Sequence, residues 1–480
     1  MTTATITSAT QLGKTTIRGD RLDVSEGNEL LLDGVSASSL IDEFGSPLFV
    51  VSEAGLRDNF RRFHTAFVKN WPEKVEVLYA MKANPTLAVR SILSEEGAGA
   101  DCFSVGELEA ALGTGTPARL VVLNGSNKSA AALRLAVESG VGVNIDADDE
   151  VDRLIALASE MSDRRPIQVK LRLKVLPKSF ESFSSDSTGK AGEDLREYLM
   201  RKKWGFTVEP AAVIIRRLLA HPALDLTGYH LHVPRVTQDA SFLAGWAGQL
   251  AEDIAALRDL TSYTPSVMDI GGGWPRERDP ESRSLELNAT TIEDYAAAVC
   301  AALRDGLTAY QVRLPQLWLE PGRYLVGNAV ALLGTVGSIK RDCDLVWVNT
   351  DISTNLLARI DATGCVHHVI AATGMHRPLD EVATIAGSTC VDSFLAQDRD
   401  VPIYQRGDLV AVLDAGMYAE STSNQFNGLP RPATVLLNGG RADLIRRAEK
   451  TRDVFARDVI PARLRVTSTA FGGAESKETK

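Results

Sequence analysis

Lys82 stands at the end of an apolar segment, Val77 to Tyr79, that has the composition of a buried parallel strand. Ala83, Asn84 and a proline follow it. A lysine in this position is either a surface residue whose ammonium reaches water or an amine held in a site as a nucleophile. The stretch alone favours the surface reading, so the remaining chemically marked residues must decide.

Two further stretches place reactive groups at strand ends. The segment GYHLHV carries His230 and His232 on one face of a strand, and no carboxylate or cysteine at suitable spacing completes a metal site. Gly271 to Gly273 directly follow the strand-like residues Val267 to Ile270. Three glycines can turn the backbone so that its N–H groups face an anion, although a plain flexible turn has the same composition.

Later motifs add an acid, a guanidinium, a thiol and a phenol. WLEPGRY holds Glu320 and Arg323 around a Pro-Gly turn, where an ordinary ion pair is the alternative. Cys390 in GSTCVDS and Tyr418 after a later strand are each unremarkable alone. Together with Lys82 they match the needs of pyridoxal phosphate: a lysine for the Schiff base, donors for the phosphate, and an acid for the pyridine nitrogen.

The elements that must position these groups alternate between strand and helix from about residue 48 to 310. Short strands and glycine-terminated helices are typical of parallel α/β units, and the span suits a (β/α)8 barrel. An open doubly wound sheet is the competing fold, but no G-x-G-x-x-G follows the first strand. After 311 strand-like segments dominate and predict a separate C-terminal β domain over 311–465, which the N-terminal strands of 1–47 join. Residues 176–200 and a tail over 466–480 have flexible composition, and we expect the tail to be disordered.

Bulk composition narrows the class of protein. The chain has 480 residues, a net charge of −10 and 44% hydrophobic residues, which argues against nucleic acid or an anionic membrane as partner. No segment is apolar enough to span a bilayer, and the polar N-terminal stretch has no signal core. Five scattered cysteines without CxxC spacing fit a reducing compartment. We therefore expect a cytoplasmic protein of at least two domains.

The chain resembles the fold-type III pyridoxal-phosphate decarboxylases, the group of diaminopimelate and ornithine decarboxylases. The matching motifs occur in the family's order from about residue 40 to 440: YAMKAN, DCFSVGELEAAL, KWGF, GYHLHV, DIGGG, EPGRYLVGNA, GSTC and GDLVAVLDAGMYAESTSNQFNGLPRPA. The last motif and SVGELEAAL are closer to the diaminopimelate branch. The resemblance implies a (β/α)8 barrel with a β domain, bound pyridoxal 5'-phosphate, and a homodimer whose active sites are shared between subunits.

Each residue that matches a family motif inherits an expected role. Lys82 would carry the Schiff base, and Cys390 would protonate the carbanion from across the dimer interface after carbon dioxide leaves. The other matches would hold the cofactor: His232 stacked on the ring, Arg172 near the ring hydroxyl, Glu320 on the pyridinium nitrogen, and Gly271, Gly272, Gly273, Arg323 and Tyr418 around the phosphate.

Three departures from the family pattern concern the phosphate and the substrate. Family members follow the histidine motif with Gly-Ser, where this chain has Pro234 and Arg235; Arg235 replaces the lost phosphate contact, binds a substrate carboxylate, or lies in a moved loop. The acid that follows the cysteine and recognises the distal amine is here Val391, with Asp392 one residue later. Arg359 falls near the position of the arginine that binds the distal carboxylate, and a surface arginine is equally compatible.

These features predict a decarboxylase of amino acids whose substrate is a modified or specialised-metabolite amino acid rather than plain diaminopimelate. A racemase or eliminase on the same fold, and a homologue without catalysis, are the alternatives. Cys390 in its family position favours decarboxylation, and the presence of both Lys82 and Cys390 disfavours a non-catalytic protein.

Overall fold

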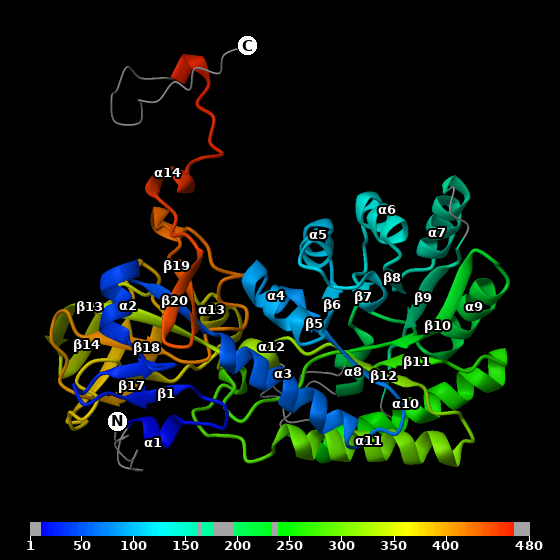
Figure 1. Cartoon of the computed structure of the whole chain (residues 1–480), viewed down its shortest axis with the longest axis horizontal. Helices are drawn as coiled ribbons and strands as arrows, with labels where there is room; N and C mark the ends of the chain where they lie inside the picture. The colour runs from blue at the N-terminus through cyan, green and yellow to red at the C-terminus, as the bar shows by residue number, and fades with distance from the viewer. Residues whose placement is uncertain (1–10, 162–164, 177–194, 233–238, 465–480) are drawn as a thin grey trace.

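Eight parallel strands close into a barrel in the computed structural model, which describes residues 11–161, 165–176, 195–232 and 239–464 (Figure 1). The barrel strands follow the order of the chain: β5 (Val75–Ala80), β6 (Gly99–Cys102), β7 (Val121–Leu123), β8 (Gly142–Ile145), β9 (Ile167–Arg172), β10 (Leu224–His230), β11 (Val267–Asp269) and β12 (Gln316–Leu319). β12 pairs with β5 in parallel and completes the closure. The predicted (β/α)8 barrel is confirmed.

Helices follow the strands and cover the barrel from outside: α4 (Leu87–Glu95), α5 (Val105–Gly113), α6 (Ala130–Ser139), α7 (Asp149–Glu160), α8 (Leu195–Met200), α9 (Val208–Leu219), α10 (Ala240–Thr261), α11 (Ile292–Ala309) and α12 (Arg323–Val326). Their ends carry local signals that the sequence encodes. The Ser104 side chain accepts the N–H of Glu107 at the start of α5, Thr291 and Asp294 form a capping box at α11, and Gly140 ends α6 in a left-handed conformation.

A nine-stranded sheet forms the second domain. Its path runs β17 (Phe394–Val401), β16 (Glu381–Ala386), β14 (Leu345–Thr350), β13 (Val330–Asp342), β4 (Leu48–Ser52), β19 (Ala433–Asn438) and β20 (Arg441–Arg446); β18 (Leu409–Val412) pairs with β13 and with β15 (Val369–Ala371). A small sheet of β1 (Leu22–Val24), β2 (Leu30–Leu32) and β3 (Val35–Ser36) contacts this domain through a bridge between Glu29 and Thr373. The N-terminal strands thus form a sheet of their own, and the expected division that joins residues 1–47 to the β domain stays a prediction.

The observed strands differ from the expected barrel limits of 48–310 at both ends. β4 lies in the β domain, between β13 and β19, and the last barrel strand ends at Leu319. An apolar run such as Leu48–Val51 fits either sheet, because both of its faces are buried in each. Most of the segment 176–200 and the tail 466–480, both predicted to be flexible, lie outside the described residues, apart from α8.

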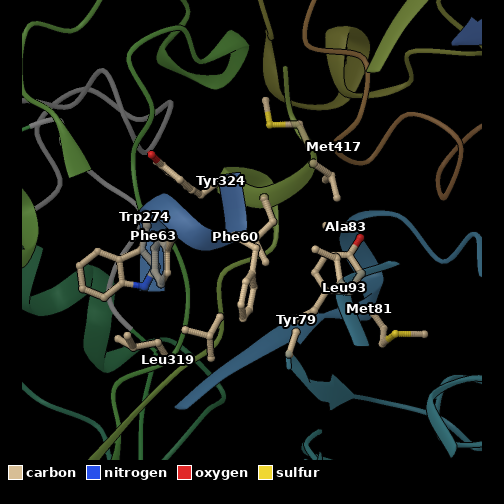
Figure 2. Packing of buried hydrophobic residues seen from close by; sticks show 14 of the residues in the cluster. Phe60, Phe63, Tyr79, Met81, Ala83, Leu93, Trp274, Leu319, Tyr324 and Met417 are labelled. Carbon is tan, nitrogen blue, oxygen red and sulfur yellow. The ribbon is translucent and has the colours of Figure 1, made fainter. Parts of the chain in front are cut away.

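The junction between the domains is aromatic and is built on α3 (Glu53–Val68). Phe63 lies 5.2 Å from Tyr324, and Phe67 lies 4.8 Å from Trp274, measured between ring centroids. Figure 2 shows this cluster, with Tyr79, Met81 and Ala83 of the β5 end in the same core. Trp274 follows the three glycines and Tyr324 follows Arg323, so α3 supports two loops of the candidate site from behind.

Candidate active site

Lys82 sits in a short 3₁₀ turn, Met81–Ala83, directly after β5. Its Nζ is 2.7 Å from Oδ2 of Asp101, which lies in β6, and 4.4 Å from the ring centroid of Phe103. The side chain of Lys82 is 34% exposed, whereas that of Asp101 is fully buried. The lysine therefore reaches the mouth of the barrel with an acid at its base, which excludes the reading of a surface lysine.

The electrostatic surroundings keep the Lys82 amine protonated. Burial acts to lower the pKa of Lys82, but interactions with Asp101, then Tyr418 and Glu320, outweigh it, so that the pKa lies above its ordinary value. Asp101 also accepts a hydrogen bond at 2.7 Å from the amide of Asn124. The acid is thereby fixed in the position that holds the ammonium.

Glu320 is buried next to Lys82 and has two neutral partners. The Asn124 amide donates to Oε1 at 2.8 Å, and Nε2 of His230 lies 3.2 Å from Oε2. Burial, followed by the charge of Arg172, holds the pKa of His230 well below its usual range, so the ring is neutral and donates through Nε2. Both oxygens of Glu320 are thereby oriented by neighbours, and the side chain can still accept a hydrogen bond from a bound group.

Asp269 completes a buried group with these two residues. Ligand atoms of His230, Asp269 and Glu320 lie within 4.8 Å of one another, so the three could hold a cation. However, burial and the charge of Glu320 raise the pKa of Asp269 well above its ordinary value. This group could therefore meet either a cation or the nitrogen of a bound ring.

The glycine loop passes close above Glu320. The N–H of Gly271 donates to Asp269 at 3.1 Å, and a Cβ at Gly272 would lie 2.3 Å from the carbonyl oxygen of Glu320. A side chain would therefore push the two loops apart. His232 is exposed, with its Nε2 3.5 Å from that Cβ position, so the loop and the predicted stacking residue lie together at the barrel mouth.

Arg172 lies at the end of β9 on the same mouth. Its Nη1 is 3.2 Å from Oδ2 of Asp146, and its guanidinium lies 5.5 Å from the ring centroid of Trp204. Trp204 belongs to KWGF, and the N–H of Phe206 donates to the carbonyl of Arg172 at 3.0 Å. That motif therefore fixes the arginine in place.

Tyr418 and two arginines lie on the side of the β domain. The Tyr418 N–H donates to the carbonyl of Ala83, beside Lys82, at 2.8 Å, and the Arg359 guanidinium lies 5.1 Å from the Tyr418 ring centroid. Arg359 and Arg323 both bind Glu281, and Arg323 also binds Asp279 at 3.0 Å. Arg359 is thus tied into the site and is not a free surface arginine.

Cys390 lies in the loop after β16 and is exposed, as are Val391 and Asp392. The backbone N–H of Cys390 donates to the side chain of Asn427 at 3.1 Å, within the β domain. Pro234 and Arg235 lie outside the described residues, so their predicted roles stay predictions.

Sequence reasoning missed five members of the site. Asp101, Asn124 and Asp269 occupy strand ends, where the alternation of strand and helix could have marked them. Asp279 and Glu281 had no such signal, because they lie in a charged loop that reads as solvent-exposed.

The residues present fit pyridoxal phosphate. The chain offers an amine at the barrel mouth, a buried carboxylate behind it with a neutral hydrogen-bonded environment, and a glycine loop beside an exposed histidine. Nδ1 of His230 and Oδ2 of Asp269 are buried without a hydrogen-bond partner among the described residues. These orphaned atoms mark the floor of the site as polar and built for a further group.

Similarity to known proteins is extensive. A family model described as "Pyridoxal-dependent decarboxylase, pyridoxal binding domain" matches residues 55–327. Diaminopimelate decarboxylases of Methanothermobacter thermautotrophicus and Archaeoglobus fulgidus are each 32% identical to the chain; they cover 92% and 90% of it, and 98% and 97% of their own lengths. The crystal structure of the diaminopimelate decarboxylase of M. jannaschii superimposes with a TM-score of 0.83 at 28% identity, covering 93% of this chain and all of its own. In complex with L-lysine, that enzyme gives a TM-score of 0.81 at 28% identity, covering 94% of this chain and 100% of its own.

Proposed function

This chain belongs to the pyridoxal-dependent decarboxylases and is a pyridoxal-phosphate-dependent amino-acid carboxy-lyase. We propose that its substrate is a diaminopimelate-like amino acid whose distal amine is not a free ammonium. The observation that carries the substrate proposal is Val391. It follows Cys390 where the family has an acid, and a valine side chain cannot accept a hydrogen bond from an ammonium. An acylated distal amine needs no such acceptor.

When bound, pyridoxal phosphate supplies an electron sink for the pair left behind when carbon dioxide departs. In our proposal Lys82 provides the amine that attaches the cofactor, and the substrate amine displaces it. The Lys82 amine must first lose its proton, and Asp101 at 2.7 Å is the nearest acceptor. Glu320 holds a proton on the pyridine nitrogen, and His230 and Asn124 keep that carboxylate oriented.

The remaining cofactor contacts form two groups. In this proposal the N–H groups of Gly271 to Gly273, with Tyr418, would bind the phosphate. Arg323, the other residue expected there, is held by Asp279 and Glu281. His232 would stack on the ring, and Arg172 would lie near the ring hydroxyl. This assignment is supported by position, because these residues lie at the carboxyl ends of the barrel strands or, for Tyr418, next to them.

Two subunits share each site in this proposal. Cys390 is exposed on the β domain, as a thiol that reaches into a neighbouring subunit must be. It would deliver the proton to Cα after carbon dioxide leaves. A homodimer follows, with a small-molecule amino acid as the other partner. A cytoplasmic location also stays a proposal, and none of the helices in the described part of the chain has the length and apolar character needed to cross a membrane.

Carbon dioxide release from purified protein with added pyridoxal phosphate tests the proposal. The substrates are diaminopimelate, lysine, ornithine and arginine in both configurations, with N-acylated forms of each. Release only from acylated forms supports the role of Val391. Equal turnover of free diaminopimelate and its acylated forms would argue against it, and would favour recognition of the free amine by Asp392. Product without carbon dioxide would point to racemisation or elimination instead.

A further inference from the structure

A carboxylate of the chain itself lies between the two arginines beside Tyr418. Oε1 of Glu281 is 2.8 Å from Nε of Arg359, and Oε2 accepts from Nη2 of Arg323. Oδ2 of Asp279 holds the other nitrogen of Arg323 at 3.0 Å. We name these four residues the arginine clamp.

The clamp borders the space where a substrate on Lys82 must extend. Arg359 stacks on Tyr418, whose backbone is hydrogen-bonded to Ala83. Arg323 comes three residues after Glu320. Tyr418 therefore connects the clamp to the residue next to the reactive amine, and in this inference the clamp is the neighbour of the distal end of the substrate.

The loop holds Glu281 firmly in this position. The Asp279 side chain accepts the N–H of Glu281 at 3.0 Å, and the N–H of Val366 donates to the carbonyl of Pro280 at 2.8 Å. The Glu281 side chain is 1% exposed, against 26% for Arg359. Because the Glu281 carboxylate is buried away from water, separating it from the two arginines would leave a buried charge without compensation, which is unfavourable.

Within these four side chains, two guanidinium groups already face two carboxylates. A carboxylate from the substrate would therefore have to compete with Glu281 for the arginines. A neutral distal group makes no such demand. We propose that Glu281 is a specificity-determining residue: it closes the arginine clamp to a second substrate carboxylate, and the enzyme takes amino acids whose distal end is uncharged. This inference rests on the proposed function, and it agrees with the missing acid at Val391.

Binding of pimelate, a dicarboxylate without amines, tests the clamp directly. Wild-type holoenzyme should show little thermal shift with pimelate, whereas Glu281→Gln leaves the clamp one positive charge and should bind pimelate about tenfold or more tightly. Glu277→Gln is the matched control, because Glu277 lies on the same loop but pairs with Arg62 at 2.7 Å. Adding Arg359→Gln to the Glu281 variant should abolish the gain.

Tight pimelate binding by the wild type would overturn the inference, and so would equal binding by the wild type and the Glu281 variant. A gain confined to cofactor affinity would also overturn it, because Glu281 would then act on the phosphate contact. The wild-type measurement stands even if the variant fails to fold. Carbon dioxide release is scored separately, so a protein inactive on every substrate counts against the proposed function and leaves the pimelate result to decide the role of Glu281.

Discussion

The ammonium of Lys82 and the carboxylate of Asp101 lie 2.7 Å apart, with the ring of Phe103 over the same ammonium. This pair holds the reactive amine in its protonated, unreactive form until the cofactor arrives. The acid therefore both positions the nucleophile and restrains it.

Replacing Asp101 with Asn should release this restraint. The charge of Asp101 supports the raised pKa of Lys82, while burial opposes it, so the variant has a lower pKa and more neutral amine at any pH below it. We expect cofactor attachment to apoenzyme at pH 7 to become about tenfold faster or more. The rise in visible absorbance after mixing, measured against pH, checks this, and an unchanged pH profile would contradict it.

Glu320→Gln should keep the cofactor but lose the reaction. The amide preserves an acceptor for Asn124 at the 2.8 Å contact, yet it cannot hold a proton on the pyridine nitrogen. We expect kcat to fall about a hundredfold or more. Cofactor content from the visible spectrum is the control, and a variant with near-normal kcat would refute the role of Glu320.

Gly272→Ala should disrupt the site through backbone crowding. Its Cβ would lie 2.3 Å from the carbonyl of Glu320, whereas a Cβ at Gly142 would come no closer than 3.8 Å to any atom of its surroundings. We expect the first variant to lose about 1–3 kcal/mol of stability along with cofactor affinity. Gly142→Ala should retain both. Melting temperature and cofactor titration of the two variants check this.

Mixing two inactive variants tests the shared site. In the proposed homodimer, Lys82→Ala and Cys390→Ala should each inactivate both sites, whereas a mixed dimer should contain one site with both residues. Unfolding and refolding an equal mixture should restore about a quarter of wild-type activity. No recovery, from a mixture shown by mass to contain mixed dimers, would place both residues in one subunit.

His367 should make stability depend on pH. It is buried, its Nδ1 lies 2.9 Å from the carbonyl of Leu413, and burial lowers its pKa. Below pH 6.5 the His367 ring gains a proton in the unfolded chain but not in the folded protein. The free energy of unfolding therefore falls by up to about 1.4 kcal/mol per pH unit. His367→Asn should therefore flatten the decline of melting temperature between pH 7 and 5. The same substitution at the exposed His376 is the control, and equal slopes for both variants would reject the prediction.

Much of the barrel is predictable because each unit is local. Helix starts depend on neighbouring residues such as Ser104, and buried parallel strands are recognisable in the sequence as short apolar runs. The order of these units then brings Lys82, Arg172 and Glu320 to one rim without any further information. β6 gives only a weak signal in the sequence because Gly99 and Asp101 have low strand propensity.

The arginine clamp could not be predicted, since its members depend on partners far along the chain. Glu281 lies among charged residues that normally face water, and its burial is favourable because Arg323, after the last barrel strand, and Arg359, in the β domain, both bind it. The membership of β4 in the β domain could not be predicted for a similar reason. Its pairing with β13 and β19 depends on strands far along the chain.

The place of β4 has a consequence for synthesis of the protein. Its two neighbours, β13 and β19, leave the ribosome long after it, and Ala433 follows Ser52 by on the order of 20 to 80 seconds at ordinary elongation rates. All eight barrel strands emerge before the β19 partner does. In the nascent chain, β4 is therefore an apolar strand with both edges unpaired while the barrel forms from later residues. A stall late in translation leaves β4 exposed to other chains.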